Sequence, residues 1–233
     1  MLSNKFIIWA SVIILSLPFW ALTGRLVVLN SSNDQLDCNT FNETFETHDN
    51  ISEVQQLPLL IISSRLSQER HLVPATLGRY GTLIRGHRSL TPEWIGECFA
   101  RLVGYYQPKH LVITLDNTIL EQSDSRLLTA LDFIIQERKR YQLNMMLSVV
   151  GVLKTPATKA LGETIDARNK AIEDWASERA DARFVDPNPR FSDLYRQPKA
   201  AFFWPDGQTL TGPGTQMLFA VLTQEIDAIR VEQ

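Results

Sequence analysis

The chain has 233 residues, of which 44% are apolar and 21% are charged, and its formal net charge at pH 7 is −3. This composition suits one globular domain with an additional segment. A slightly acidic chain without a basic patch indicates no nucleic-acid partner, because nothing would offset a phosphate backbone.

Cysteine and histidine usage gives no sign of a metal site. Two cysteines, Cys38 and Cys98, are too few for a disulfide framework or a Cys-rich zinc site. A single bridge between them, in an oxidising compartment, and two free thiols are both open at this stage. The four histidines lie far apart, with no metal-ligand spacing: His48, His71, His87 and His110. We therefore expect no metal and no cofactor.

Residues 1–29 are predicted to lie outside the folded body. Within them, residues 6–22 (FIIWASVIILSLPFWAL) form an apolar run that is just long enough to span a membrane as a helix. Lys5 precedes the run and favours an amino terminus inside the cytoplasm. We expect a single-pass membrane protein with an extracytoplasmic C-terminal domain. The alternative is secretion after signal cleavage, although residues 21–23 (ALT) are a poor small-x-small cleavage site.

Residues 30–56 have a different composition from the rest of the chain. They carry six acidic side chains and no Lys or Arg, and Asn, Thr and Ser dominate. Apolar residues are too sparse there to bury a core. We predict an acidic, Asn/Thr-rich tether, followed by one domain at residues 57–233.

Apolar runs and helical patterns alternate through this domain. Three runs rich in Leu, Ile and Val are typical of buried parallel strands, at residues 57–62, 110–115 and 144–150. Residues 80–84 and 183–186 are weaker strand candidates. The spacing of apolar residues predicts one helix that starts at Pro92, after an N-cap at Thr91. It predicts three more helices at residues 125–141, 163–179 and 213–230. This order predicts an α/β fold, a three-layer α/β/α sandwich with a parallel, flavodoxin-like five-stranded sheet.

Polar residues follow several of the predicted strands. In parallel sheets, functional groups gather where strands end at their carboxyl edge. Four segments meet this condition: Ser63-Ser64, residues 85–87, Asp116-Asn117, and the loop at residues 205–212 before the last helix.

In this order, the four segments resemble the four sequence blocks of the SGNH hydrolases, the GDSL esterase/lipase family. The resemblance covers residues 57–230. It implies that Ser64 stands at the position of the nucleophile. Gly86 in IRGHRSLT and Asn117 in VITLDNTIL stand at the positions of the two oxyanion donors. In DGQTLTGPGTQML, Asp206 stands at the position of the catalytic acid, and Thr209 stands where the family has its His.

Two departures from the family pattern bear on activity. Ile62 and Ser63 replace the Gly-Asp that precedes the nucleophile, and Thr209 cannot titrate near neutral pH as a catalytic His does. Without its base, a serine hydrolase loses several orders of magnitude in rate. His87, next to Gly86, is the only other His that we would test as a base.

The resemblance implies an ester hydrolase or acyl transferase that acts on an acylated carbohydrate or lipid. The alternative is a catalytically inactive, membrane-tethered binding or scaffold protein, in which Ser64, Asn117 and Asp206 act as caps and turn formers. A nucleotide-binding flavodoxin-like protein is disfavoured, because no Gly-rich loop follows the first strand. The sequence names no protein partner.

Overall fold

The computed structural model describes Cys38 and residues 58–66, 75–78, 80–86 and 90–232. The chain divides into two units, Met1–Phe41 and Asn42–Gln233. The second unit contains the sheet and the helices that cover it. The predicted apolar run and nearly all of the predicted tether lie outside the described residues. Within the described part of the chain, no helix is long and apolar enough to cross a membrane.

Five parallel strands form one sheet in the order β2-β1-β3-β4-β5. The strands are β1 (Leu59–Ile62), β2 (Thr82–Arg85), β3 (His110–Thr114), β4 (Met146–Val150) and β5 (Ala182–Val185). This is the predicted flavodoxin-like sheet, and each strand lies within two residues of its predicted bounds. All four residues of β1 are buried, as expected for a strand covered on both faces.

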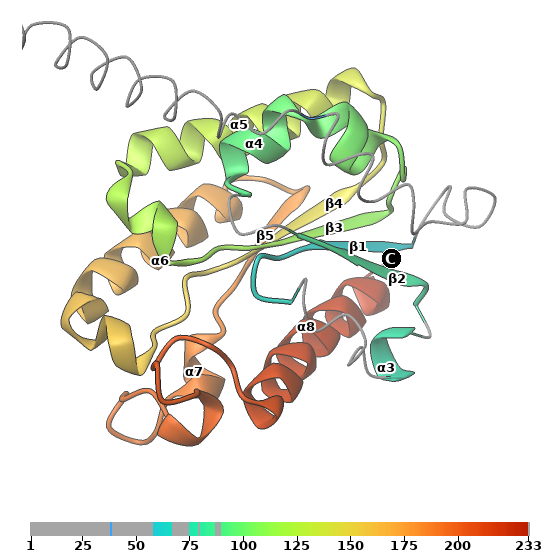
Figure 1. The fold of residues 1–233 in the computed structure, drawn as a ribbon. Helices are drawn as coiled ribbons and strands as arrows, with labels where there is room; N and C mark the ends of the chain where they lie inside the picture. The colour runs from blue at the N-terminus through green and yellow to red at the C-terminus, as the bar shows by residue number, and fades with distance from the viewer. Residues whose placement is uncertain (1–37, 39–57, 67–74, 79, 87–89, 233) are drawn as a thin grey trace, which may run out of the picture. The chain divides into compact units, whose positions relative to one another are not determined.

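Helices cover both faces of the sheet (Figure 1). On one face lie α4 (Pro92–Glu97) and α5 (Asp124–Arg140), and α6 (Gly162–Ser177) packs beside α5 and against β5. On the other face lie α3 (Ala75–Gly78) and α8 (Gly212–Glu232). The three-layer α/β/α arrangement is therefore confirmed for the described residues.

A large apolar cluster fills the space between the sheet and α8. From α8 it includes Leu218, Phe219, Leu222 and Ile226, and from the strands it includes residues such as Val112. Burying each of these side chains contributes about 1.5–3 kcal/mol relative to leaving it exposed. This cluster fixes α8, and with it the loop that enters α8, against the sheet.

Local signals set the helix boundaries. The Thr91 hydroxyl accepts a hydrogen bond from the Trp94 N–H, and Pro92 occupies the first turn, as the sequence predicted. The Ser123 hydroxyl caps α5 in the same way, through the Arg126 N–H. After α4 the chain continues as a π-helix, η2 (Ala100–Gly104), which the sequence pattern did not predict.

The segment between β5 and α8 has little regular structure. It holds α7 (Asn188–Phe191) and the 3₁₀ helix η5 (Ala200–Phe202), and an isolated antiparallel bridge pairs Phe203 with Leu210. Gly214 passes so close to this segment that a Cβ there would lie 2.2 Å from the Phe202 carbonyl oxygen. The close approach requires glycine at this position and holds the start of α8 against the loop.

Both cysteines, Cys38 and Cys98, are disulfide-bonded, and none is free. The sequence left a disulfide and two free thiols open, and the structure has the cysteines in the oxidised, disulfide-bonded form. Cys98 is the C-cap residue of α4 and is buried.

Candidate functional site

The carboxyl ends of three neighbouring strands define the candidate site. In the sheet register Ile62 of β1 pairs with Arg85 of β2 and with Ile113 of β3. The residues that follow these strand ends include Ser64, Gly86 and Asn117. The structure thus places the three predicted residues at one edge of the sheet, on adjacent strands.

Ser63 ties the three strand ends together. Its N–H donates to the Arg85 carbonyl oxygen at 2.9 Å, and its hydroxyl oxygen accepts from the Thr114 hydroxyl at 2.6 Å. The same oxygen accepts from the Leu66 N–H at 3.1 Å, which closes a turn over Ser64. Ser63 is 1% exposed, so these bonds are shielded from water. Together they fix the backbone on either side of Ser64.

The Ser64 hydroxyl points to a carboxylate. Ser64 Oγ donates to Asp116 Oδ2 at 2.8 Å, across 52 residues of sequence. The other carboxylate oxygen, Oδ1, accepts from the N–H of Thr118 at 2.9 Å and from its hydroxyl. Asp116 therefore acts both as the N-cap of the following 3₁₀ helix, η3 (Asn117–Glu121), and as the partner of Ser64. The sequence pattern placed Asp116 at this edge but indicated no role for it.

Asn117 and Gly86 stay predictions as oxyanion donors. Asn117 opens η3, and its Oδ1 is buried with no hydrogen-bond partner in the described part of the structure. A buried polar atom without a partner is rare in proteins and marks a group that a ligand or water can satisfy. Because the oxygen and nitrogen of an amide exchange on flipping, the same position can present an acceptor or a donor.

A buried arginine from α6 holds η3 in place. The Arg168 guanidinium donates to the carbonyl oxygens of Ile119 at 3.1 Å and of Gln122 at 2.6 Å. It also pairs with Asp124 at 2.7 Å, and its side chain is 8% exposed. Arg168 thus positions the turn that carries Asp116.

The last loop closes on itself around Asp206. One oxygen of this carboxylate accepts from the N–H groups of Gln208 at 2.8 Å and of Thr209 at 2.9 Å. The other accepts from the Thr209 hydroxyl at 2.5 Å. The Thr209 hydroxyl and these N–H groups, in that order, hold the pKa of Asp206 below its ordinary value. Asp206 therefore forms the turn that the sequence analysis gave as its structural role.

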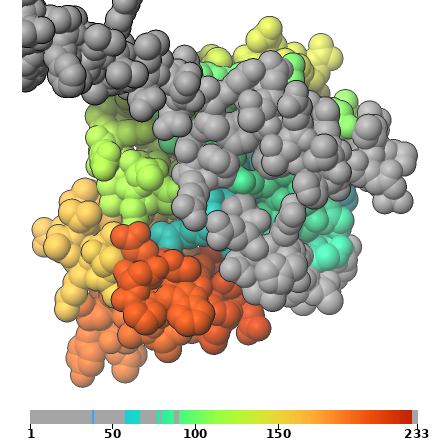
Figure 2. Space-filling view, in the orientation of Figure 1, coloured from blue at the N-terminus to red at the C-terminus, as the bar shows by residue number. Residues whose placement is uncertain are grey.

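Arg65 connects the strand ends to this loop. Its Nη1 donates to the Gln208 carbonyl oxygen at 3.0 Å. Burial lowers the pKa of Arg65, and the charge of Asp116 opposes this effect. The surface of the last loop, orange in Figure 2, lies next to the cyan surface of the first-strand region. Sequence reasoning missed Arg65; the available signal was a charged residue directly after a buried strand at the carboxyl edge.

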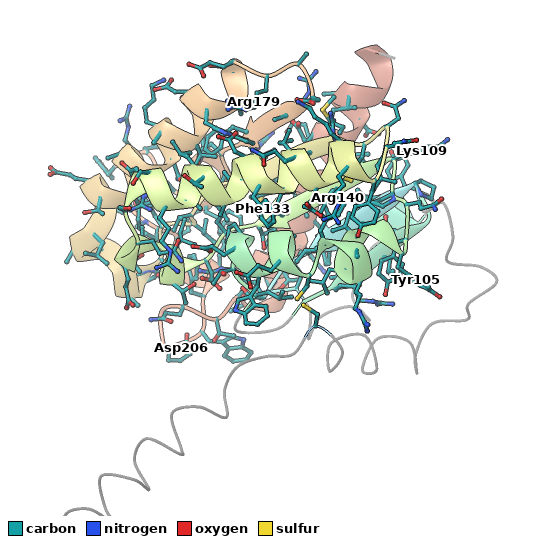
Figure 3. The ribbon with its side chains drawn as sticks, turned by 90° about the horizontal axis from the view of Figure 1, so that it is seen from above. Tyr105, Lys109, Phe133, Arg140, Arg179 and Asp206 are labelled. Atoms are coloured by element: carbon teal, nitrogen blue, oxygen red, sulfur yellow. The ribbon has the colours of Figure 1, made fainter. Side chains whose placement is uncertain are left out.

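The described residues place no imidazole at this edge. His110, the one described histidine, begins β3 at the opposite edge, where its Nε2 lies 2.9 Å from Ser148 Oγ. Burial, and then the charge of Arg183, lower the pKa of His110 to about 4. Figure 3 shows the separation of the edges, with Asp206 at one end of the domain and Lys109, which precedes His110, at the other. The candidate base His87 lies outside the described residues.

No protein-family model and no curated protein matches the sequence. Solved structures do match. A GDSL-like lipase from Bacteroides thetaiotaomicron is 16% identical with a TM-score of 0.64, over 81% of this chain and 98% of the lipase. A catalytic mutant of an acetylxylan esterase from Geobacillus stearothermophilus is 14% identical with a TM-score of 0.57, over 75% and 96% of the two chains. A family 3 carbohydrate esterase from Clostridium thermocellum is 16% identical with a TM-score of 0.55, over 74% and 97%. The chain therefore has the SGNH hydrolase fold.

Proposed function

We propose that the protein is an ester hydrolase or acyl transferase that uses Ser64 on an acylated carbohydrate or lipid outside the cytoplasm. The observation that carries the proposal is the 2.8 Å hydrogen bond from Ser64 Oγ to Asp116, at the edge where this fold places its nucleophile. A hydroxyl with an adjacent proton acceptor is the minimal arrangement for nucleophilic catalysis.

Ser64 and Asp116 can carry an acyl group and a proton through a complete reaction cycle. Ser64 Oγ attacks the ester carbonyl carbon while its proton passes to Asp116 Oδ2, and the carbonyl oxygen becomes an oxyanion. Gly86 N–H and the Asn117 amide are the proposed donors to that oxyanion. When the tetrahedral intermediate collapses, the leaving alkoxide takes the proton from Asp116. Water or a second alcohol then attacks the acyl-enzyme by the same route, which gives hydrolysis or acyl transfer.

Slow turnover follows from the identity of the base. Carboxylates as a class are weaker bases than imidazole near neutral pH, so general-base catalysis by Asp116 is less effective than catalysis by a His. When a triad member is missing, oxyanion donors and substrate binding still accelerate the reaction roughly a thousandfold over the rate in water. We expect measurable but low esterase activity.

The substrate class and the location rest on further support. Of the three solved structures named above, two are esterases whose names specify acetylxylan or carbohydrate. Disulfide-bonded cysteines are typical of exported proteins. With the apolar run at residues 6–22, they support a domain held outside the cytoplasm by an N-terminal membrane anchor.

A second candidate function is a catalytically inactive, membrane-tethered binding or scaffold protein. The observation that favours it is the closed Asp206–Thr209 turn, in which the carboxylate of the family's acid position is bonded to the residue at the His position. In this candidate Ser64 only braces Asp116 at the start of η3.

A fluorophosphonate probe separates the two candidates. The full chain in detergent should be labelled at Ser64, and Ser64→Ala should abolish the label. Asp116→Asn should slow labelling by roughly a hundredfold, the low end of what general-base catalysis supplies. Ser192→Ala, at the half-buried C-cap of α7, is the matched control and should label like the native chain. A folded native chain without label contradicts the enzymatic proposal and leaves the binding protein.

A further inference from the structure

We propose that Arg65 forms a binding subsite for an oxyanion of the ligand, a carboxylate or a phosphate, next to Ser64. This inference rests on the proposed function and deepens it, since it makes the substrate an acylated carbohydrate or lipid that carries a negative charge.

The hydrogen bonds of Arg65 leave one N–H of its guanidinium group without a partner among the described residues. Nη1 donates to the Gln208 carbonyl oxygen at 3.0 Å. Nε is buried and has no hydrogen-bond partner among the described residues. Nε and Nη2 form the edge of the guanidinium that binds a carboxylate or phosphate through two parallel hydrogen bonds. The bond to Gln208 therefore orients the group, and the Nε of its recognition edge has no partner among the described residues.

The carboxylates of the two segments that Arg65 links are engaged with other donors. Asp116 accepts from Ser64 and from Thr118, and Asp206 accepts from Gln208 and Thr209. Asp116 attracts the Arg65 charge without outweighing the cost of its burial. A partly buried cation with an unpaired N–H is stabilised by a ligand that brings both the countercharge and the acceptor.

The place of Arg65 in the chain sets where the anion would lie. Arg65 directly follows Ser64, and its guanidinium group reaches the loop that carries Thr209. An oxyanion bound there lies on the side of Ser64 that faces this loop, and it belongs to the same ligand as the ester. The charge would then select which ester is presented to Ser64.

Binding of small probes to the full chain in detergent tests the subsite. The probes are glucuronate, glycerol 3-phosphate and uncharged glucose, titrated by calorimetry at low ionic strength. The native chain should bind at least one anion in the millimolar range and glucose more weakly. Tighter binding of glucuronate indicates an acidic sugar, and tighter binding of glycerol 3-phosphate indicates a lipid headgroup. Added salt should weaken either interaction.

Four variants assign the effect to Arg65. Arg65→Met should weaken anion binding at least tenfold. The anion affinity of Arg65→Lys should lie between those of Arg65→Met and the native chain, because Lys keeps the charge but lacks the planar guanidinium group. Asp116→Asn should strengthen anion binding severalfold, because it removes a nearby negative charge. Arg101→Met, at an exposed position of η2, is the control and should bind like the native chain.

Two results would overturn the inference: equal anion affinity in the native chain and Arg65→Met, or no anion binding by the native chain. If Arg65→Met does not fold, Arg65→Lys and Asp116→Asn must still shift the affinity in opposite directions. Fluorophosphonate labelling of the same samples keeps this test apart from the proposed function. If the native chain binds the anion but is not labelled, only the enzymatic proposal is contradicted. If the chain is labelled but Arg65→Met does not change anion binding, only the subsite is contradicted.

Discussion

On the strand side of the candidate site, side chains from different strand ends bond to one another, whereas on the loop side Asp206 and Thr209 bond within a single turn. The strand side consists of Ser63, Ser64, Thr114 and Asp116, whose contacts join residues about 50 apart in sequence. The loop side spans four residues and is exposed. A network with long sequence separation exists only in the folded domain, whereas a local turn needs little support from the fold.

This difference shows which side of the candidate site depends on the folded domain. The strand side holds the Ser64 hydroxyl against the Asp116 carboxylate, and the following residue, Asn117, has a buried side-chain oxygen without a partner among the residues that the structure describes. On the loop side, the Asp206 carboxylate is bonded by Thr209 within its own turn. Arg65 is the link between them, through Gln208. The strand side is therefore the part on which substitutions should have the largest effects.

Removing the support of the strand side should produce the largest change. Arg168→Met keeps the apolar stem but leaves the carbonyl oxygens of Ile119 and Gln122 without their donor. We expect the free energy of unfolding to fall by about 3 kcal/mol, the usual scale for breaking a buried charged network. Urea denaturation measures this loss.

The control for Arg168 is Arg126, an exposed arginine of α5 that pairs with Glu93. Arg126→Met should cost about 0.5 kcal/mol or less, as for other surface ion pairs. In Arg168→Met, fluorophosphonate labelling should also slow, while the amide signals of residues 206–209 stay unchanged. Equal losses in the two variants would remove Arg168 from its positioning role.

Much of this layout could be predicted from the sequence. Runs such as residues 110–115 are apolar throughout, so burial on both faces determined both their strand character and the parallel sheet. Short elements such as α7 and η3 hold four or five residues, too few for a helical period to be seen. Whether the side chain of Asp116 or that of Asn117 reaches Ser64 depends on how the backbone rotates after β3. That rotation is set by the Asp116 cap and by Arg168, 52 residues from the cap, so no local pattern contains it.

Restoring a base on the loop side should have the next largest effect. Thr209→His places an imidazole in the loop that Arg65 joins to Ser64, with Asp206 in the same turn to orient it. We expect hydrolysis of a short activated ester to rise tenfold or more, which is a small share of what general-base catalysis supplies. The double variant Thr209→His with Ser64→Ala should show no gain. A folded Thr209→His chain without a gain would mean that the two sides do not meet at a reacting ester.

The amino edge of the sheet gives a smaller effect that should not touch the site. The pKa of His110 lies below its unfolded value, so the unfolded chain binds more protons between pH 6.5 and about 4, and stability falls as the pH falls through this window. Relative to pH 7.5, His110 should cost about 1 kcal/mol at pH 5.5. The difference in urea denaturation between the native chain and His110→Gln measures it. Labelling at Ser64 should be the same in both, and a difference would place His110 in the site.

The smallest effect concerns the loop turn itself. Thr209→Val removes the hydroxyl that contributes most to the lowered pKa of Asp206, so that pKa should rise toward its ordinary value. A carboxylate whose pKa is lower in the folded chain than in the unfolded chain stabilises the fold at pH values above its unfolded-state pKa. This stabilisation is lost as the pH falls through the folded-state pKa. Carboxyl NMR titration of Asp206 reads the change directly. Thr211→Val, in the same loop, is the control, because the Thr211 hydroxyl donates to the Ala201 carbonyl oxygen and not to Asp206. If Thr209→Val leaves the Asp206 titration unchanged, the loop is not closed in solution, and Asp206 is then free to orient a base supplied from elsewhere in the chain.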